Sequence, residues 1–212
     1  MLKEKIYFIL GIGTDIGKTF FMEKLCQKFP NSKAVKPIVT GFNADDKNCD
    51  TVRLQNVMRK NNKNFSLSEI SPFAYNQPSS PHLVAKIDYQ KIVEFCQKEI
   101  SIANNKNSYL FIESAGGVMT PITYHKTFLD LVKDVDISVL LISSNYLGAI
   151  SHTLTAIEVL KINNIKIEKI FINDQLSANQ NFFKNYDDIN FADIANTIES
   201  FTSIPVSKIN VI

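Results

Sequence analysis

A glycine-rich loop between a strand-like run and a helix-like run constrains this chain more than any other feature. Apolar residues from Ile6 to Leu10 lead into the loop Gly11–Thr19, which ends in Gly-Lys-Thr, and a helical pattern follows from Phe20 to Phe29. In such a loop, backbone N–H groups at the helix N-terminus bind phosphate, a lysine reaches the outer phosphates, and a threonine hydroxyl binds Mg²⁺. The order of the three segments therefore predicts a site for a nucleoside triphosphate.

The glycine spacing departs from the usual phosphate loop. That pattern has a glycine at the position of Ile12, whereas the first glycine here is Gly11. An ordinary glycine turn is the alternative. It leaves unexplained why Lys18 and Thr19 stand in the first helical turn, where a cation opposes the helix dipole unless an anion is bound. We therefore interpret the segment as a phosphate loop. Its expected nucleotide-binding residues are Gly13, Gly17, Lys18 and Thr19.

The bulk composition is that of one folded domain spanning residues 1–212. Hydrophobic residues make up 45% of the chain, and the formal net charge is +2, which gives no electrostatic footprint for nucleic acid. No apolar run approaches the ~20 residues of a membrane span, and the segment before Ile6 has no signal-peptide pattern. The three cysteines stand far apart and are expected to be free thiols. We expect a cytoplasmic protein that contacts neither nucleic acid nor membrane.

Apolar runs alternate with helical patterns along the chain. The expected strands are Ile6–Leu10, Ala34–Ile38, Tyr109–Glu113, Ile137–Ser143, Lys169–Asn173 and a short one near Ile204–Val206. The expected helices are Lys18–Phe29, Thr51–Lys60, Tyr89–Ala103, Phe128–Val132, Ile150–Asn163 and Phe191–Phe201. Continuous apolar strands are typical of a parallel sheet covered on both faces. The alternation predicts a doubly wound, mostly parallel α/β fold of the P-loop NTPase type, whose ligands collect at the carboxyl ends of the strands.

Polar residues stand at this expected carboxyl edge. Lys36 and Thr40 fall at the end of the second strand, Glu113 closes the third, and Asn173 closes the fifth. A second cation such as Lys36 stabilises the charge of a transferring phosphate. Glu113 stands where such enzymes hold Mg²⁺, and the small residues after it, among them Gly116, let a ligand approach the backbone.

Two features stay open on these grounds. Asp50 begins the Thr51–Lys60 helix and is either its N-cap or a metal ligand, with the cap favoured from position alone. Residues 175–190 form a long Asn-rich stretch punctuated by aromatic side chains, and loops of this length are usually functional or disordered.

Taken together, the motifs resemble the dethiobiotin synthetase family over nearly the whole chain. The family's stretched loop, Gly-Thr-x-Thr-Asp/Glu-x-Gly-Lys-Thr, is similar to Gly11–Thr19 and accounts for the early glycine. Other family motifs resemble Lys36-Pro37-Ile38-Val39-Thr40-Gly41, Cys49-Asp50, Pro78-Ser79-Ser80-Pro81-His82, Glu113-Ser114-Ala115-Gly116-Gly117 with Pro121, Leu147–His152 and Asn173-Asp174.

Several positions depart from the family pattern. Ile12 and Gly13 replace a polar pair in the loop, Ser114 replaces a glycine beside Glu113, and Ser151 stands where the family often has asparagine. None of these changes removes a charged group. In the family, the segment that corresponds to Ile204–Val206 lies near the nucleotide base. Here only a short stretch follows it.

The resemblance implies an ATP-dependent enzyme that makes the ureido ring of dethiobiotin from 7,8-diaminopelargonate and CO₂ or bicarbonate, with Mg²⁺. An amine of the substrate captures CO₂ as a carbamate. The carbamate attacks the γ-phosphate of ATP, and the neighbouring amine closes the ring and expels phosphate. The protein contributes mainly positioning and charge stabilisation.

The resemblance also implies a role for each site residue. The catalytic set is Lys18, Lys36, Thr14 and Asp15. The nucleotide set is Gly13, Gly17, Lys18, Thr19, Glu113, Gly116, Asn173 and Pro205. The Mg²⁺ ligands are Thr19, Asp50 and Glu113, which reverses the cap-first interpretation of Asp50. The substrate set is Thr40 with Gly148, Ala149, Ile150 and Ser151. That last turn binds the substrate carboxylate from the partner subunit, so a homodimer is implied.

Three other classes share parts of this pattern. A partitioning-type ATPase switch carries a further lysine five residues before the main one, where this chain has Gly13. A cobyrinate-type amidoligase usually adds a glutaminase domain, for which this chain has no room. A nucleotide-binding scaffold without catalysis would form no product in an ATP-dependent assay.

Overall fold

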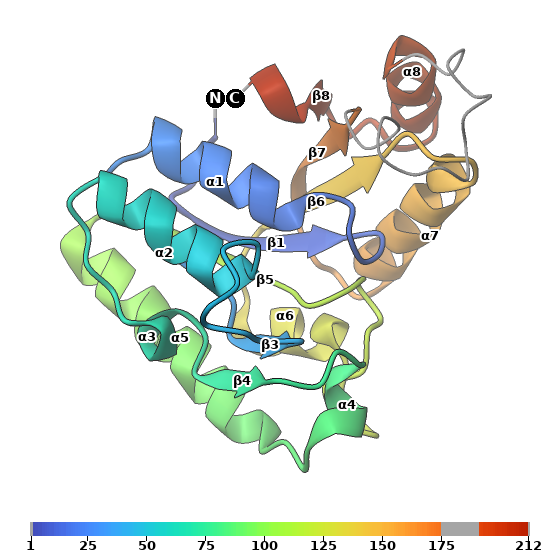
Figure 1. Ribbon diagram of the computed structural model, residues 1–212. Helices are drawn as coiled ribbons and strands as arrows, with labels where there is room; N and C mark the ends of the chain where they lie inside the picture. The colour runs from blue at the N-terminus through green and yellow to red at the C-terminus, as the bar shows by residue number, and fades with distance from the viewer. Residues whose placement is uncertain (1, 175–190, 212) are drawn as a thin grey trace.

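The core of the protein is a parallel sheet, seen in a computed structural model that describes residues 2–174 and 191–211. Its six described strands lie in the order β2-β5-β1-β6-β7-β8, and every neighbouring pair is parallel (Figure 1). The strands are β1 Ile6–Gly11, β2 Ser32–Val35, β5 Tyr109–Glu113, β6 Val139–Ser144, β7 Ile167–Asn173 and β8 Val206–Lys208. The predicted parallel α/β fold is confirmed. The long stretch expected at 175–190 lies outside the described residues.

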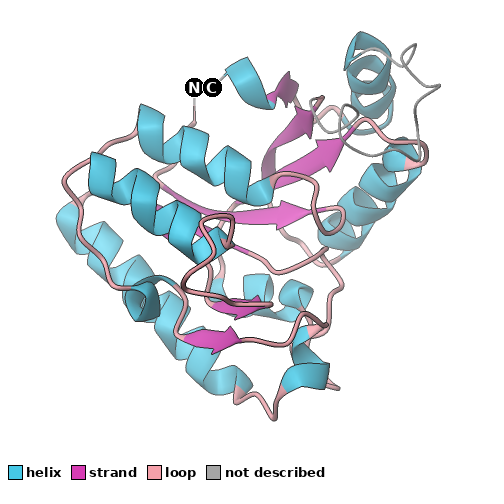
Figure 2. Cartoon of the chain, viewed as in Figure 1, coloured by secondary structure: helices cyan, strands magenta, loops and turns pink. Residues whose placement is uncertain are grey.

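Helices cover both faces of the sheet, as the two figures of the whole chain show (Figures 1 and 2). One face is covered by α1 Lys18–Lys28 and α2 Asp50–Lys60. The other is covered by α5 Tyr89–Lys106, α6 Phe128–Val135, α7 Ala149–Ile162 and α8 Phe191–Thr202. Strand β1 shows why helices must cover both faces of the sheet. Tyr7 and Ile9 are fully buried on one face, and Phe8 and Leu10 are fully buried on the other. None of the described helices has the length and apolar character to cross a membrane.

The end of the predicted strand Ala34–Ile38 is wrong, because the chain leaves the main sheet after Val35. Strand β2 ends at Val35, and β3 Ile38–Thr40 pairs instead with β4 Phe73–Tyr75 in a separate two-stranded sheet. After Val35 the Lys36 amide donates to the Ile70 carbonyl at 3.0 Å, and Pro37 has no backbone N–H to donate to a ladder. The break leaves Lys36 directly after β2 and carries Thr40 away to the second sheet.

Three short helices complete the described chain. These are α3 Leu67–Ile70, α4 Pro81–Val84 and the 3₁₀ helix η2 Ile209–Val211. Helix α4 begins at a proline, whose fixed φ suits the first position of a helix. It follows the Pro78–Ser80 segment, which borders the carboxyl edge of the sheet.

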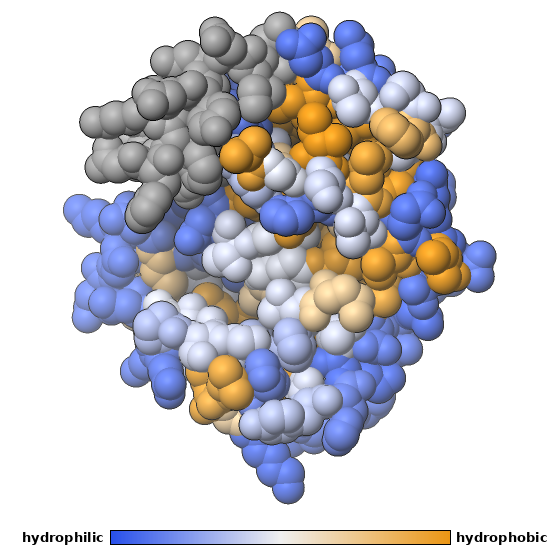
Figure 3. Space-filling model, turned by 90° about the vertical axis from the view of Figure 1, so that its right-hand side faces the viewer, coloured by the Kyte–Doolittle hydropathy of each residue, from blue (hydrophilic) through white to orange (hydrophobic). Residues whose placement is uncertain are grey.

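The parallel register brings the ends of β2, β1 and β5 together. Val35 pairs with Ile112, and Ile9 pairs with Glu113. The residues that follow these strands therefore meet at one edge. Figure 3 looks at this side of the molecule, where residues of near-neutral hydropathy gather around the middle and hydrophobic residues flank them.

Candidate nucleotide and metal site

The loop between β1 and α1 is shaped by two glycines. A Cβ at Gly11 would lie 2.6 Å from Ile16 Cδ1 and 2.9 Å from Lys18 Cδ. Gly11 therefore leaves room for the side chains of Ile16 and Lys18. Gly17 has φ +94°, a left-handed conformation that favours glycine, and stands immediately before α1.

The N-terminus of α1 is prepared for an anion. It has no side-chain cap hydrogen bond and no acidic residue in its first turn. Lys18 and Thr19 are both buried there, and Lys18 Nζ donates to the Gly13 carbonyl at 2.7 Å. Burial lowers the pKa of Lys18 to about 8, and the nearby Lys36 charge acts in the same direction. A phosphate would satisfy the helix N–H groups and stabilise this ammonium.

A buried cluster of charged side chains lies beside the loop. Lys36 Nζ donates to Glu113 Oε1 at 2.8 Å and also to Asp50 Oδ2. Thr19 Oγ1 donates to the same Glu113 oxygen at 2.9 Å. The side chains of Lys36 and Glu113 are 8% and 1% exposed, whereas that of Asp50 is 33% exposed. Four residues therefore meet at one point: one directly after β2, one at the end of β5, and one each in the first turns of α1 and α2.

The pKa directions in this cluster follow from burial and from Lys36. Burial raises the pKa of Glu113, and the positive charge of Lys36 only partly offsets it. Burial would also raise the pKa of Asp50, but Lys36 outweighs it and the pKa lies below its ordinary value. Burial would lower the pKa of Lys36, yet the charges of Glu113 and Asp50 raise it above its ordinary value.

The donor set fits a hard divalent cation. Glu113 Oε2 is buried and has no hydrogen-bond partner among the described residues, so one carboxylate oxygen is available for a ligand. With the Thr19 hydroxyl and the Asp50 carboxylate, it offers oxygen ligands of the kind that Mg²⁺ prefers. Within the described ranges no three His, Cys, Asp or Glu side chains gather into a metal site. A metal here would therefore share its coordination with phosphate oxygens.

Two adjoining cavities contain most of the predicted site residues. A cavity of about 310 Å³ is lined by Thr14, Asp15, Gly17, Lys18, Thr19, Phe20, Lys36, Asp50, Arg53, Glu113, Gly116 and Asn173. A second, of about 650 Å³, shares Thr14, Asp15, Lys36, Asp50 and Gly116 and adds Thr40, Gly41, Pro78–Pro81, Ala115, Thr120 and Pro121. A phosphate end and an organic substrate could thus lie side by side.

Other predicted residues stand elsewhere. Gly13 lies in a third cavity of about 520 Å³, whose lining also includes Thr14 and His152. Gly148 has φ +97° and stands before α7, followed by Ala149, Ile150 and Ser151, and none of these four lines the three cavities. Pro205 precedes β8, where its carbonyl accepts from the Ile170 amide. The structure does not bring these last residues to the phosphate cavity within one chain.

Two lining residues with ionisable side chains were not among the predicted site residues. Arg53 lines the phosphate cavity from α2, and His152 lines the third cavity from α7. The spacing could have revealed Arg53, because a residue three positions after Asp50 shares its helix face. His152 stood in a family-like motif but had no metal-spaced partner.

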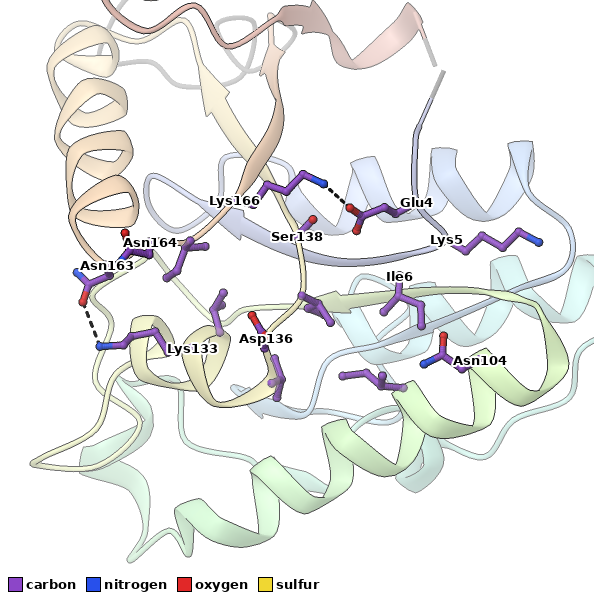
Figure 4. A pocket seen from close by; sticks show the side chains of 15 residues that line it. Glu4, Lys5, Ile6, Asn104, Lys133, Asp136, Ser138, Asn163, Asn164 and Lys166 are labelled. Carbon is purple, nitrogen blue, oxygen red and sulfur yellow. Dashed lines mark hydrogen bonds and ion pairs between the residues drawn. The ribbon is translucent and has the colours of Figure 1, made fainter.

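A larger cavity lies at the opposite edge of the sheet. It measures about 710 Å³ and lies at the amino ends of β1, β6 and β7 (Figure 4). Glu4 and Lys166 point toward each other there, and Lys133 Nζ donates to Asn163 Oδ1 at 3.1 Å. No residue selected from the sequence lines it.

Comparison with known proteins identifies relatives of this chain. Residues 5–207 match the model of a family described as an AAA domain. An ATP-dependent dethiobiotin synthetase of Legionella pneumophila (strain Paris) is 38% identical over 169 residues, 77% of each chain. One from Francisella tularensis subsp. holarctica is 34% identical over 172 residues, covering 77% of this chain and 76% of that protein.

Solved structures share the fold at low identity. The cell division protein MinD of Aquifex aeolicus has a TM-score of 0.53 at 12% identity, over 96% of this chain and 80% of its own. A ParA family ATPase of Chlorobium tepidum TLS has a TM-score of 0.54 at 12% identity, over 96% and 83%. These likenesses support the P-loop fold alone.

Proposed function

The chain belongs to the ATP-dependent dethiobiotin synthetase family, and we propose that it closes the ureido ring of dethiobiotin from 7,8-diaminopelargonate, CO₂ and ATP. Membership makes it an ATP-dependent ligase of biotin biosynthesis. One observation carries the proposed reaction: Lys18, Lys36, Thr19, Asp50 and Glu113 line a single cavity at the mouth of a phosphate loop.

Lys18 and Lys36 are the proposed phosphate-facing cations. Lys18 already donates to a loop carbonyl at 2.7 Å, so its ammonium is held within the loop that would wrap the triphosphate. Lys36 is held between two carboxylates from neighbouring elements. Charge that develops on the transferring phosphoryl group would be stabilised by these fixed cations with little reorganisation.

Thr19, Asp50 and Glu113 would hold Mg²⁺. Bound there, the metal would neutralise phosphate charge. The chain's own contribution is to keep oxygen ligands from α1, α2 and β5 in one place, with one Glu113 oxygen buried and unpaired among the described residues.

Thr14, Asp15 and Thr40 would line the diamine and carbamate site. They border the 650 Å³ cavity that adjoins the phosphate cavity and shares Lys36 with it. In this arrangement an amine of the substrate captures CO₂ as a carbamate, and a carbamate oxygen attacks the γ-phosphate and releases ADP. The second amine then attacks the carbamoyl carbon and expels phosphate. Holding these groups together is the main source of rate enhancement.

The remaining roles complete the proposal. Gly13, Gly17, Gly116 and Asn173 would contact the nucleotide, with Pro205 near its base. The turn Gly148, Ala149, Ile150 and Ser151 would bind the substrate carboxylate from the partner subunit of a homodimer, because a helix N-terminus favours an anion. We place this single-domain enzyme in the cytoplasm.

One assay tests the proposal. The purified protein is incubated with 7,8-diaminopelargonate, bicarbonate, Mg²⁺ and ATP, and dethiobiotin is measured by mass. Product that depends on all four components is expected. Absence of product from a folded protein that binds ATP would overturn the proposed reaction.

A further inference from the structure

We propose that Arg53 is a third cationic residue of the phosphate cavity, that it contacts the γ-phosphate of bound ATP, and that Glu23 positions it. The inference rests on the proposed function and adds a ligand-binding residue to it. Arg53 lines the same cavity as Lys18 and Lys36, yet it belongs to none of the motifs that identified the site.

Arg53 is held by two hydrogen bonds to one carboxylate. Its Nε donates to Glu23 Oε1 at 3.1 Å, and its Nη2 donates to Glu23 Oε2 at 2.6 Å. Such a two-point contact fixes the plane of the guanidinium group. The side chains of Arg53 and Glu23 are 32% and 22% exposed, so the pair borders the cavity and is open to an incoming ligand.

The Arg53–Glu23 pair joins the two helices that begin at the site. Glu23 lies one turn after Thr19 on α1, and Arg53 lies one turn after Asp50 on α2. Residues so spaced share a helix face. The pair therefore connects α1 and α2 one turn after the residues Thr19 and Asp50, which are proposed to bind Mg²⁺. Figure 1 shows these two helices side by side.

Part of the guanidinium group remains available. A guanidinium group has five N–H donors, and Glu23 accepts from two of its nitrogens. Nη1 makes no hydrogen bond to the residues that the structure describes, 2–174 and 191–211. A planar group clamped on one side and open on the other is suited to a phosphate oxygen.

The charge balance of the cavity favours a phosphate role over a purely structural one. The charged side chains that line it are Asp15, Lys18, Lys36, Asp50, Arg53 and Glu113. They amount to three cations and three anions. Glu23, the partner of Arg53, stands outside this lining, so on the cavity side Arg53 contributes a positive charge. Partly exposed ion pairs contribute only about 0–1 kcal/mol to stability, so a helix tie alone would gain little from this placement.

Arg53 also stands beside a proposed metal ligand. It follows Asp50 by one helical turn on α2, and both residues line the phosphate cavity. Arg53 therefore lies close to the proposed metal and γ-phosphate position. Together with the clamp and the open nitrogen, this makes the outer phosphate its proposed ligand.

The test is nucleotide binding by titration calorimetry, measured with Mg²⁺ and either ATP or ADP. Arg53→Ala is expected to weaken ATP binding about tenfold and ADP binding less than threefold, because only ATP carries the γ-phosphate. Arg53→Lys keeps the charge without the planar fork and should lose less ATP affinity than Arg53→Ala. Arg59→Ala, farther along the same helix and exposed, is the matched control and should bind both nucleotides as the wild type does.

Glu23→Gln separates positioning from a structural role. If Glu23 orients Arg53, this variant should weaken ATP binding by an intermediate factor, whereas a helix tie alone would change only the thermal unfolding temperature. ATP binding by folded Arg53→Ala within twofold of wild type, or equal losses for ATP and ADP, would overturn the inference. Dethiobiotin formation is scored separately, so a wild type that binds ATP through Arg53 but forms no dethiobiotin would refute the proposed reaction and leave this inference standing.

Discussion

Lys36 Nζ lies 2.8 Å from Glu113 Oε1, although the two residues are 77 positions apart in the sequence. They meet because β2 and β5 are parallel neighbours whose register pairs Val35 with Ile112, the residues immediately before them. Both side chains are almost fully buried. Removing one partner of a buried ion pair leaves the other charge uncompensated, which is costly. Substituting either residue should therefore change stability or activity by a measurable amount.

Lys36→Ala should lower turnover far more than ATP binding. Lys36 is proposed to act on the transferring phosphoryl group, whereas Lys18 and the loop retain most contacts to the nucleotide. We expect kcat to fall about 10²-fold or more with the Kd for ATP changed only a few-fold. Steady-state kinetics and calorimetry check this, with Lys36→Arg as a charge-retaining control. Equal losses in both quantities would remove Lys36 from a transition-state role.

The same substitution should destabilise the fold. Removing Lys36 leaves Glu113 buried without its counter-charge, which costs about 3–5 kcal/mol in comparable cases. The double variant Lys36→Ala/Glu113→Gln should recover part of this loss because it removes the stranded carboxylate. Urea unfolding of the wild type, two single variants and double variant measures the coupling. Strictly additive losses would show that the two side chains do not depend on each other.

Glu113→Gln should raise the Mg²⁺ requirement of dethiobiotin formation. The amide keeps the shape of the side chain but removes the anionic oxygens that attract a hard cation. A titration of activity against Mg²⁺ should shift to higher concentration, whereas Glu158→Gln, an exposed change on α7, should leave the curve in place. An unchanged curve for Glu113→Gln would exclude it as a metal partner.

Two buried thiols should make the protein less stable in alkali. Burial raises the pKa of Cys26 to about 11 and that of Cys96 to about 12, whereas an unfolded thiol loses its proton near pH 8.5. Above that pH the unfolded state binds fewer protons than the folded state, so stability falls as pH rises, by about 1.4 kcal/mol per pH unit for each thiol. The lowered pKa of Lys18 acts in the opposite direction over this range, so the thiol contribution is measured as the difference between the wild type and Cys26→Ala/Cys96→Ala in urea unfolding from pH 8 to pH 10. The wild type should lose more stability with rising pH than the double variant. An identical slope in both proteins would contradict the prediction.

Thr127→Ala should weaken the start of α6. Thr127 Oγ1 accepts from the Asp130 amide at 3.4 Å, and Asp130 Oδ2 accepts from the Thr127 amide at 2.8 Å. Losing such a cap costs about 1 kcal/mol, with ATP affinity unchanged. Thermal unfolding checks the cost, and Thr127→Ser, which keeps the hydroxyl, should stay close to wild type. A Thr127→Ala protein as stable as wild type would show that the cap contributes nothing.

The apolar runs predicted the main sheet because its strands are buried on both faces. Tyr109–Glu113 matches its observed strand end for end, and β1 extends its prediction by one residue. The same reasoning failed at Pro37, where the predicted strand Ala34–Ile38 spans a change of sheet. The β3–β4 pairing involves strands of three residues each, too short for periodicity to reveal.

The site was predictable where a residue follows a strand and less so where a helix face places it. Lys36 and Glu113 both follow or close parallel strands, so their meeting could be expected from topology. Asp50 was ambiguous by position. In the structure Cys49 is the N-cap and Asp50 begins α2 paired with Lys36. The spacing from Asp50 puts Arg53 on the same helix face, but its pairing with Glu23 depends on how α1 and α2 pack, which no single segment encodes.

The ammonium group of Lys36 sits between the carboxylates of Asp50 and Glu113, the oxygens proposed to receive a divalent ion. It therefore serves as a resident counter-ion that keeps two acids compatible with the protein interior. Glu113 Oε2 has no hydrogen-bond partner among the described residues, so a metal ion has an oxygen to bind there while Lys36 stays on Oε1. Lys36 should consequently keep its place when metal and nucleotide arrive, with its ammonium already beside the incoming phosphate.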